Sequence, residues 1–266
     1  TITDETTKLT LQSDSMLTSQ DGWTYKFGTL DLNGSALSVK MAMSINEPLI
    51  LDAAGEQILT GTSGLTLNDS LAISAGKLSS QSGLISFGST ANLGTDGIIE
   101  IQDGTLQLSD NLSIEGGKFN LADLAELNLN NDVSITSDRA LIFGTLEMNN
   151  RNLKVTTTED AELNIKKAFN LNNASNLQLN GTNLTFSETA AIAGILEPSG
   201  GTLTFQKGGS VSGTINSKNS TLVLQTENLV YTGLLKTNSG TTLSGANLLN
   251  LSNGTLEVEG SINLDN

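Results

Sequence analysis

The sequence of 266 residues contains no cysteine and no histidine. Their absence excludes disulfide bonds, thiolate nucleophiles, imidazole general bases and the common structural zinc sites. Catalytic triads built on histidine or cysteine are excluded with them. Most soft-metal chemistry is also excluded, and oxygen atoms are the main ligands left for a metal ion.

Charged and aromatic residues are also scarce, at 15% and 4% of the chain. The charge that is present is mostly negative, with a formal net charge of −15 and a pI of about 4.2. Such a chain repels phosphate backbones and anionic lipids, so we expect no nucleic-acid partner. No run of about 18 apolar residues occurs, which predicts no membrane span in this chain.

Short alternating apolar stretches fill the remainder of the sequence. Leu65-Thr66-Leu67, Leu106-Gln107-Leu108 and Leu222-Val223-Leu224 are typical. Turn-forming residues follow at once, as in Asn68-Asp69-Ser70 and Asn180-Gly181-Thr182. A period of two predicts strands, and the short spacing leaves no room for ordinary helices. The sequence therefore predicts an all-β protein.

Two internal similarities indicate a repeat. Residues 27–39 return as 143–155 with the apolar positions, the Gly-Thr pair and an Asn kept. Residues 119–129 match 169–179, and the Asn-Asn-Ala-Ser in the second copy predicts strand, turn and strand in both, although the leucines of 121–127 would also fit a helix. Such a unit buries its apolar face by stacking on its neighbours.

Gly-Thr-Leu tripeptides begin at Gly28, Gly104, Gly144, Gly201 and Gly254, separated by 76, 40, 57 and 53 residues. These separations share an approximate divisor of 19, which predicts a parallel β-helix (β-solenoid) of about 14 coils with three strands and three turns in each. We expect one solenoid domain over residues 1–266, a piece of a longer repeat protein. The alternative is a pair of antiparallel β-sandwiches offset by about 116 residues.

Several local features of the sequence lead to further expectations. Residues 41–48 are the least regular and predict a loop that leaves the coil. Pro48 and Pro198 fit corners where no ladder donor is needed. Threonine does not recur as Thr-x-Thr at a fixed period, so no ice-binding threonine array is expected. Trp23 and Tyr25 suit an end cap on the first coil.

Residues 201–205 (Gly-Thr-Leu-Thr-Phe), 228–233 (Asn-Leu-Val-Tyr-Thr-Gly) and 239–243 (Ser-Gly-Thr-Thr-Leu) resemble the passenger repeats of bacterial autotransporters and of filamentous-haemagglutinin-type exoproteins. The resemblance implies a secreted bacterial β-helix at the cell surface, with an adhesive or structural role. The matching positions form the coil, so the resemblance implies no functional residue.

Acidic side chains are the only candidates for chemistry. Glu100, Asp103, Glu159, Asp160 and Glu162 form clusters that suit a solvated acidic face better than a pair of glycosidase carboxylates. Arg139 and Arg151 stand apart from those clusters. The sequence predicts no catalytic residue and no cofactor. Calcium at Asp123, Glu126, Asp132 or Asp138 is chemically possible, but no ligand spacing is diagnostic, so the metal ligands are unknown.

These observations predict a non-catalytic extracellular module, structural or adhesive, of a bacterial surface or secreted protein. The expected partner is a host or neighbouring-cell surface, through a glycan or protein ligand that the sequence does not identify. One alternative is a self-assembling filament, sheath or surface-layer subunit that associates end to end. A polysaccharide-active β-helix enzyme is the minor alternative.

Overall fold

The structure is a computed structural model that describes residues 3–18, 24–158, 161–224, 229–244, 250–251, 253–259 and 261–263. Within these ranges the secondary-structure elements are all β-strands, and the paired strands run parallel. The chain is a β-solenoid of about 11 turns. The prediction of the fold class is confirmed, and the alternative of antiparallel sandwiches is wrong.

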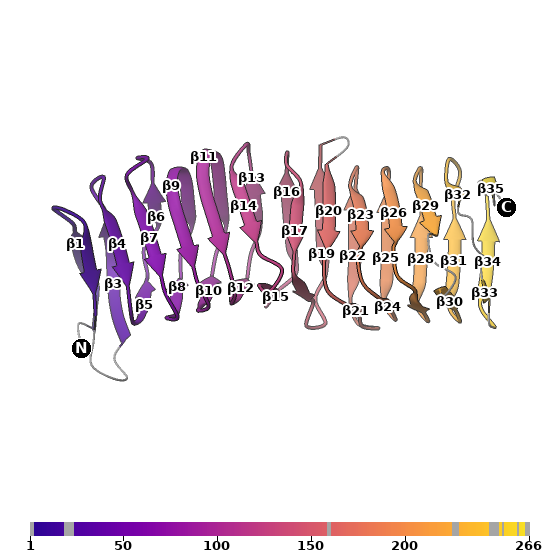
Figure 1. The fold of residues 1–266 in the computed structure, drawn as a ribbon, viewed down its shortest axis with the longest axis horizontal. Coiled ribbons are helices and arrows are strands. Elements are labelled where there is room, and N and C mark those ends of the chain that lie inside the picture. The colour runs from indigo at the N-terminus through magenta and orange to yellow at the C-terminus, as the bar shows by residue number, and fades with distance from the viewer. Residues whose placement is uncertain are drawn as a thin grey trace. The chain divides into compact units, whose positions relative to one another are not determined.

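The chain forms two compact units, Thr1–Val133 and Ser134–Asn266. Within each unit, strands of successive turns lie side by side (Figure 1). One turn of the solenoid is called a rung below. The prediction of a single domain over the whole length stays a prediction.

Unit 1 consists of two main sheets. The first sheet contains, in order, β1 (Thr3–Thr10), β3 (Thr24–Asp31), β5 (Ala42–Ile45), β8 (Leu65–Leu67), β10 (Leu84–Phe87), β12 (Thr105–Leu108) and β15 (Glu126–Leu129). The second contains β2 (Ser15–Leu17), β4 (Ala36–Val39), β7 (Gln57–Thr60), β9 (Leu71–Ser80), β11 (Ala91–Ile101) and β13 (Leu112–Ile114). In addition, β6 (Leu49–Leu51) pairs with β9, and β14 (Lys118–Leu121) pairs with β11.

Unit 2 has three strands in most of its rungs. One sheet contains β16 (Val133–Ser137), β19 (Leu153–Thr157), β22 (Asn176–Asn180), β25 (Ile195–Ser199), β28 (Thr214–Ser217), β31 (Leu234–Thr237) and β34 (Thr255–Val258). The next contains β17 (Leu141–Phe143), β20 (Glu162–Ile165), β23 (Asn183–Phe186), β26 (Thr202–Phe205), β29 (Thr221–Leu224), β32 (Thr242–Ser244) and β35 (Ser261–Asn263). The third contains β21 (Phe169–Leu171), β24 (Ala190–Ile192), β27 (Gly209–Val211), β30 (Leu229–Tyr231) and β33 (Asn250–Leu251), and β18 (Thr145–Glu147) follows β17.

The core consists of apolar columns that run from rung to rung. Leu65, Ile85, Leu106 and Leu127 lie in register and are fully buried. In unit 2 the rings of Phe186 and Phe205 pack with centroids 5.1 Å apart. Full burial of one such side chain stabilises the fold by about 1.5–3 kcal/mol, so the inner columns dominate the stability of each unit.

The solenoid has fewer turns than expected because many rungs are longer than the predicted period. Leu153 pairs with Leu177, a longer step along the chain than the one from Thr24 to its partner Ala42. The rungs from β22 to β29 do keep the predicted period, as where Leu203 pairs with Leu222. Turns absorb the extra residues, so the inner columns stay in register.

The first internal repeat is a repeated turn. Asn33 and Gly34 both have positive φ, at 48° and 76°, and so do Asn149 and Asn150, at 48° and 61°. In each copy the N–H of the residue after the pair donates to the carbonyl of the residue before it, at 2.9 Å and 2.8 Å. These are the features of a type I′ turn, which asparagine and glycine tolerate best.

The second repeat is also confirmed as strand, turn and strand. In β14–β15 the Ala125 N–H donates to the Ala122 carbonyl at 2.8 Å, and in β21–β22 the Ser175 N–H donates to the Asn172 carbonyl at 3.1 Å. Leu124 lies at the tip of its turn and is 67% exposed, which a helix packed through its leucines would not allow. The β6–β7 segment is a third copy, with the Glu56 N–H bonded to the Ala53 carbonyl.

Two expectations about irregular places were wrong. Residues 42–45 form β5, and Met43 and Ile45 are buried in the core, so this stretch stays in the coil. Pro48 does precede a strand, but Pro198 lies inside β25, in register with Leu179. Because proline has no N–H, the pairing of β25 with β28 is interrupted after Leu196, and it resumes where Ser199 pairs with Lys218.

Candidate functional site

The outer faces of the strands carry short polar side chains that bond from one rung to the next. The Ser86 hydroxyl donates to Gln107 at 3.3 Å, and the Gln107 amide donates to Asn130 at 2.8 Å. In unit 2 the Ser187 hydroxyl donates to Asn164 at 2.8 Å. These side-chain hydrogen bonds tie neighbouring rungs together.

Ion pairs on the outer face also join neighbouring rungs. Lys8 pairs with Asp31, Lys77 with Glu100, Lys207 with Glu188, and Lys236 with Glu257, at N–O distances of 3.0, 2.6, 2.6 and 3.6 Å. All of these side chains are at least a quarter exposed. Exposed pairs of this kind contribute at most about 1 kcal/mol each to the free energy of unfolding. They therefore fix the positions of the charged side chains and stabilise the fold only slightly.

A second polar network surrounds Glu197 on β25. Its carboxylate accepts from Asn176 at 2.8 Å, Gln178 at 2.9 Å and Asn216 at 3.4 Å. The Asn238 amide donates in turn to Asn216 at 2.9 Å. These hydrogen bonds, led by the one from Asn176, lower the pKa of Glu197 although partial burial opposes the shift.

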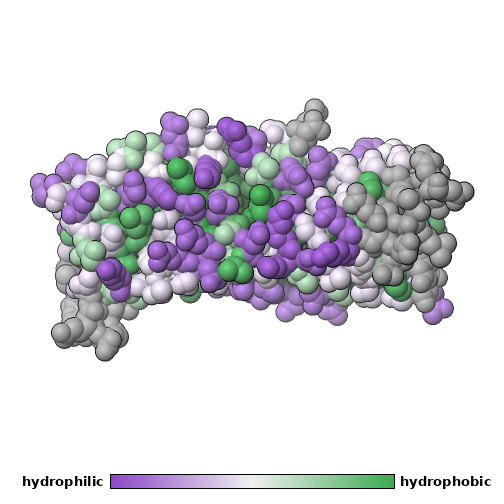
Figure 2. Space-filling view, viewed as in Figure 1, coloured by the Kyte–Doolittle hydropathy of each residue, from purple (hydrophilic) through white to green (hydrophobic). Residues whose placement is uncertain are grey.

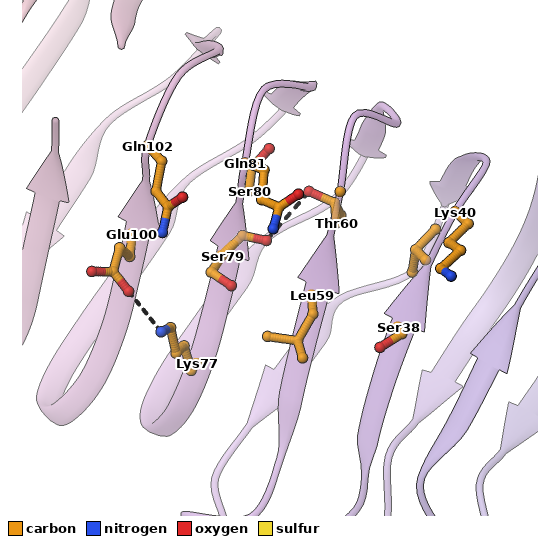
Figure 3. Close-up of a pocket in the computed structure, with 12 residues that line it drawn as sticks. Ser38, Lys40, Leu59, Thr60, Lys77, Ser79, Ser80, Gln81, Glu100 and Gln102 are labelled. Carbon is orange, nitrogen blue, oxygen red and sulfur yellow. Dashed lines mark hydrogen bonds and ion pairs between the residues drawn. The ribbon is translucent and has the colours of Figure 1, made fainter. Parts of the chain in front are cut away.

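A depression lined by polar side chains lies across β4, β7, β9 and β11 in unit 1, with a volume of about 320 Å³ (Figure 3). Its floor includes one outward column in which Ser38, Leu59, Ser79 and Glu100 stand in register. We call this depression the polar hollow.

The residues that follow these strands form a second outward column over the polar hollow. They are Lys40, Gly61, Gln81 and Gln102, one on each rung. The Gln81 N–H donates to the Thr60 and Gly61 carbonyls, and the Gln102 N–H donates to the Ser80 carbonyl, so the backbone pairing continues past the strand ends. Glycine at position 61 leaves a gap between two long polar side chains.

The charges around the polar hollow are unequal. The Lys77 ammonium lies 2.6 Å from the Glu100 carboxylate, and this hydrogen bond is the main cause that lowers the pKa of Glu100. Lys40 is exposed and forms no ion pair with a described residue. Two ammonium groups and one carboxylate give the polar hollow a local excess of positive charge, in a chain whose net charge is −15.

Two other depressions are less polar. One lies across β9, β11 and β13 in unit 1, where Ser74, Gly94 and Glu115 line it, and has a volume of about 230 Å³. The other has a volume of about 370 Å³ and lies on the β21–β24–β27 sheet. In its column Phe169 is followed by the smaller residues Ala190 and Gly209. On the face shown in Figure 2, hydrophilic residues predominate and hydrophobic residues form small separate patches.

The acidic residues proposed from the sequence are scattered. Glu100 pairs with Lys77, and Glu162 accepts from Asn164 at 3.4 Å, whereas Asp103 is exposed. Glu159, Asp160 and Trp23 lie outside the described residues. Arg139 and Arg151 are exposed.

Among the described residues no three or more acidic side chains converge on a point where a metal ion could bind. Of the calcium candidates, Glu126 accepts from Asn128 at 2.9 Å, and Asp123 lies in an exposed turn. The structure therefore brings none of Asp123, Glu126, Asp132 and Asp138 together as a ligand set within the part of the chain that it describes.

Some threonines line up across neighbouring rungs, which the sequence did not predict. Thr202, Thr221 and Thr242 lie in register on three consecutive rungs of unit 2. The neighbouring outward column continues from Thr185 and Thr204 to Val223, so the hydroxyl array is interrupted by an apolar residue. The two rungs that separate these threonines differ in length, which hides the column from a search at one fixed period.

Sequence reasoning missed the polar hollow because no local motif marks it. Lys40, Gly61, Gln81 and Gln102 are far apart in the sequence and meet only through the strand register. Comparisons with family models, with curated proteins and with solved structures find no match. The described residues contain no helix that is long and apolar enough to cross a membrane.

Proposed function

We propose that this chain is a non-catalytic structural and adhesive module of a secreted or surface-exposed bacterial protein. Its working surface is the outer face of the solenoid, and its partner is a glycan or protein on a host or neighbouring cell. The resemblance of residues 201–205 and 228–233 to secreted passenger repeats supports the location and the bacterial source.

The main support for this proposal is the difference between the inner positions of the strands, which are apolar and buried, and the outer positions, which are mostly polar and partly exposed. Inner columns such as Leu65, Ile85 and Leu106 are uniformly apolar and buried. The outer column beside them, Thr66, Ser86 and Gln107, changes from rung to rung and remains partly exposed. A scaffold of this kind holds a variable polar surface in fixed positions, which suits binding to large, repetitive partners.

The proposal is tested by coating beads with the full chain and measuring their retention on immobilised glycans and on cell layers, with beads carrying an unrelated acidic protein as the control. Retention above that control supports an adhesive module. Failure on every surface, together with filaments in electron microscopy that grow with protein concentration, would favour the self-assembling subunit. Turnover of an acidic polysaccharide in the presence of calcium would overturn the non-catalytic assignment.

A further inference from the structure

Gly61 borders the polar hollow at a position where neither the backbone nor the packing requires glycine. A Cβ built on Gly61 meets no heavy atom within 4 Å, and its φ lies outside the left-handed region. By contrast, a Cβ on Gly83 or Gly104 would lie within 2.5 Å of a neighbouring backbone oxygen. Packing therefore explains Gly83 and Gly104, whereas at Gly61 the consequence of glycine is an empty space between Lys40 and Gln81.

The groups that border this space are suited to a polyhydroxylated anion. Gln81 and Gln102 are exposed, and their amides form no side-chain hydrogen bond with a described residue, so they can bond to hydroxyl groups of a ligand. Ser38 lies on the floor on the same rung as Lys40, and Ser79 lies on the floor on the same rung as Gln81. The Lys40 ammonium offers three donors to a carboxylate.

Leu59 supplies an apolar patch on the same floor. It occupies an outward strand position between Ser38 and Ser79, and it is partly exposed (Figure 3). Pyranose rings have one face of C–H groups, and such a face packs on an aliphatic side chain while the ring hydroxyls bond to polar groups at the edges. The apolar floor, the Gln81 amide and the Lys40 ammonium thus match three different parts of one sugar.

From these features we infer that the polar hollow binds one carboxylate-bearing sugar of an acidic glycan. Lys40 binds the carboxylate, Leu59 contacts the apolar ring face, and Gln81 bonds to the hydroxyls of the same sugar. Gln102 lies three rungs from Lys40 and bonds to the next sugar of the glycan. The volume of about 320 Å³ is near the lower limit of small-molecule sites, which suits a single sugar unit of a chain that continues along the surface. This inference rests on the proposed function and names the ligand class for it.

Lys77 and Glu100 line the edge of the polar hollow that lies away from Lys40 (Figure 3). Because their charges neutralise each other at 2.6 Å, the net attraction for an anion comes from Lys40. A neutral sugar would keep the contacts with Leu59 and the amides but would lose the charge-assisted bond. The site therefore distinguishes an acidic sugar from its neutral counterpart.

Isothermal titration calorimetry of the full chain with trigalacturonate, and with its methyl ester, tests this inference. We expect the acid to bind at least about ten-fold more tightly than the ester. Lys40→Gln should weaken binding of the acid at least about ten-fold, and Gly61→Gln should abolish it by filling the gap. Lys26→Gln is the matched control, because Lys26 is an exposed lysine on β3, outside the polar hollow.

Loss in the Lys40 and Gly61 variants, with retention in the Lys26 variant, would support the site. Equal binding of acid and ester, equal loss in all three variants, or no binding of trigalacturonate and of sialyllactose would overturn it. Sulfate that competes fully at the same concentration would reduce the site to a simple anion site and would also overturn the sugar assignment. Adhesive beads that lose no retention with Lys40→Gln or Gly61→Gln would leave the proposed function standing and reject this site alone.

Discussion

At the scale of single residues, Glu56 stabilises a corner of unit 1 that other copies of the same turn build without a carboxylate. It is 6% exposed and accepts from the Asp52 and Ala53 N–H groups at 2.8 and 3.2 Å, and from the Gly34 N–H at 3.2 Å. The corresponding residues in the other two copies are Ala125 and Ser175. Glu56 thus joins its own turn to the type I′ turn one rung earlier.

Replacing Glu56 by alanine should lower the free energy of unfolding by about 1–3 kcal/mol, because three backbone donors lose an anionic acceptor. Urea denaturation followed by circular dichroism measures the loss. Glu47→Ala is the control, since Glu47 is exposed and its change should stay within about 0.5 kcal/mol. Equal effects of the two substitutions would show that the Glu56 bonds contribute nothing specific.

Glu197 should make the stability depend on pH. Its pKa is lowered in the folded chain, so its stabilising effect is fully present above the unfolded value of 4.5 and is lost as the pH falls through the folded value. Glu197→Gln should therefore destabilise the protein at pH 7 and have a smaller effect at pH 3. Denaturation midpoints at the two pH values measure this difference.

The control for Glu197 is Glu259→Gln, because Glu259 is an exposed glutamate that also lies in unit 2. Its effect on the denaturation midpoint at pH 7 should be small, because an exposed side chain loses few contacts. A Glu197→Gln effect that is constant from pH 7 to pH 3 would mean that the amide network does not bind the ionised carboxylate preferentially.

At the scale of elements, a column of glycines sets how closely the strands of unit 2 approach at one corner. Gly194, Gly213, Gly233 and Gly254 each precede a strand of the β25–β28–β31–β34 sheet. A Cβ on Gly213 would lie 2.1 Å from the Gly194 carbonyl oxygen, and one on Gly233 would lie 2.0 Å from the Gly213 oxygen. No side chain fits there without a shift of the backbone.

Gly213→Ala should therefore destabilise unit 2 by about 1–3 kcal/mol through overpacking. Gly61→Ala is the control, because its Cβ enters open space, and it should be neutral or stabilise by up to about 1 kcal/mol. Thermal and urea denaturation of both variants check the pair. A neutral Gly213→Ala would mean that the corner is looser than the structure shows.

The sequence was sufficient to predict strands and the inner columns, because leucine or isoleucine at every second position gives each strand one apolar face. Parallel stacking was favoured by the internal repeats, but alternation alone also fits antiparallel sheets. The sequence was insufficient for sheet membership, because such short strands look alike. Gly28 lies in β3 and Gly104 precedes β12 of the same sheet. The strand register, however, passes through Phe27, Ile45, Leu67, Phe87 and Leu108. The two glycines therefore do not share a column. Gly201 and Gly254 precede strands of different sheets, so their separation is no whole number of turns.

The candidate site was beyond sequence reasoning for a related physical reason. Carboxylates are easy to recognise in a sequence, but among the described residues no three of them converge on one point. The polar hollow depends on which residues share a column, and that depends on rung lengths that vary along the chain. Rung lengths are set by turns, whose residues tolerate insertion at little cost.

At the scale of the whole molecule, every functional statement depends on neighbouring rungs lying in parallel register. The absence of cysteine makes this testable with introduced pairs. Thr66→Cys with Ser86→Cys in unit 1, and Thr204→Cys with Val223→Cys in unit 2, place two thiols on register partners about 4.8 Å apart. That separation permits a disulfide, whereas the pair Thr66→Cys with Gln107→Cys spans two rungs and about 9.6 Å, which does not.

The most direct test is mild oxidation of these variants at low concentration, with intramolecular disulfides counted by mass spectrometry after alkylation. We expect near-complete bridging of both register pairs and little bridging of the two-rung pair. Failure of the register pairs to bridge, or bridging of the two-rung pair to the same extent, would contradict the parallel solenoid and every proposal built on its outer face.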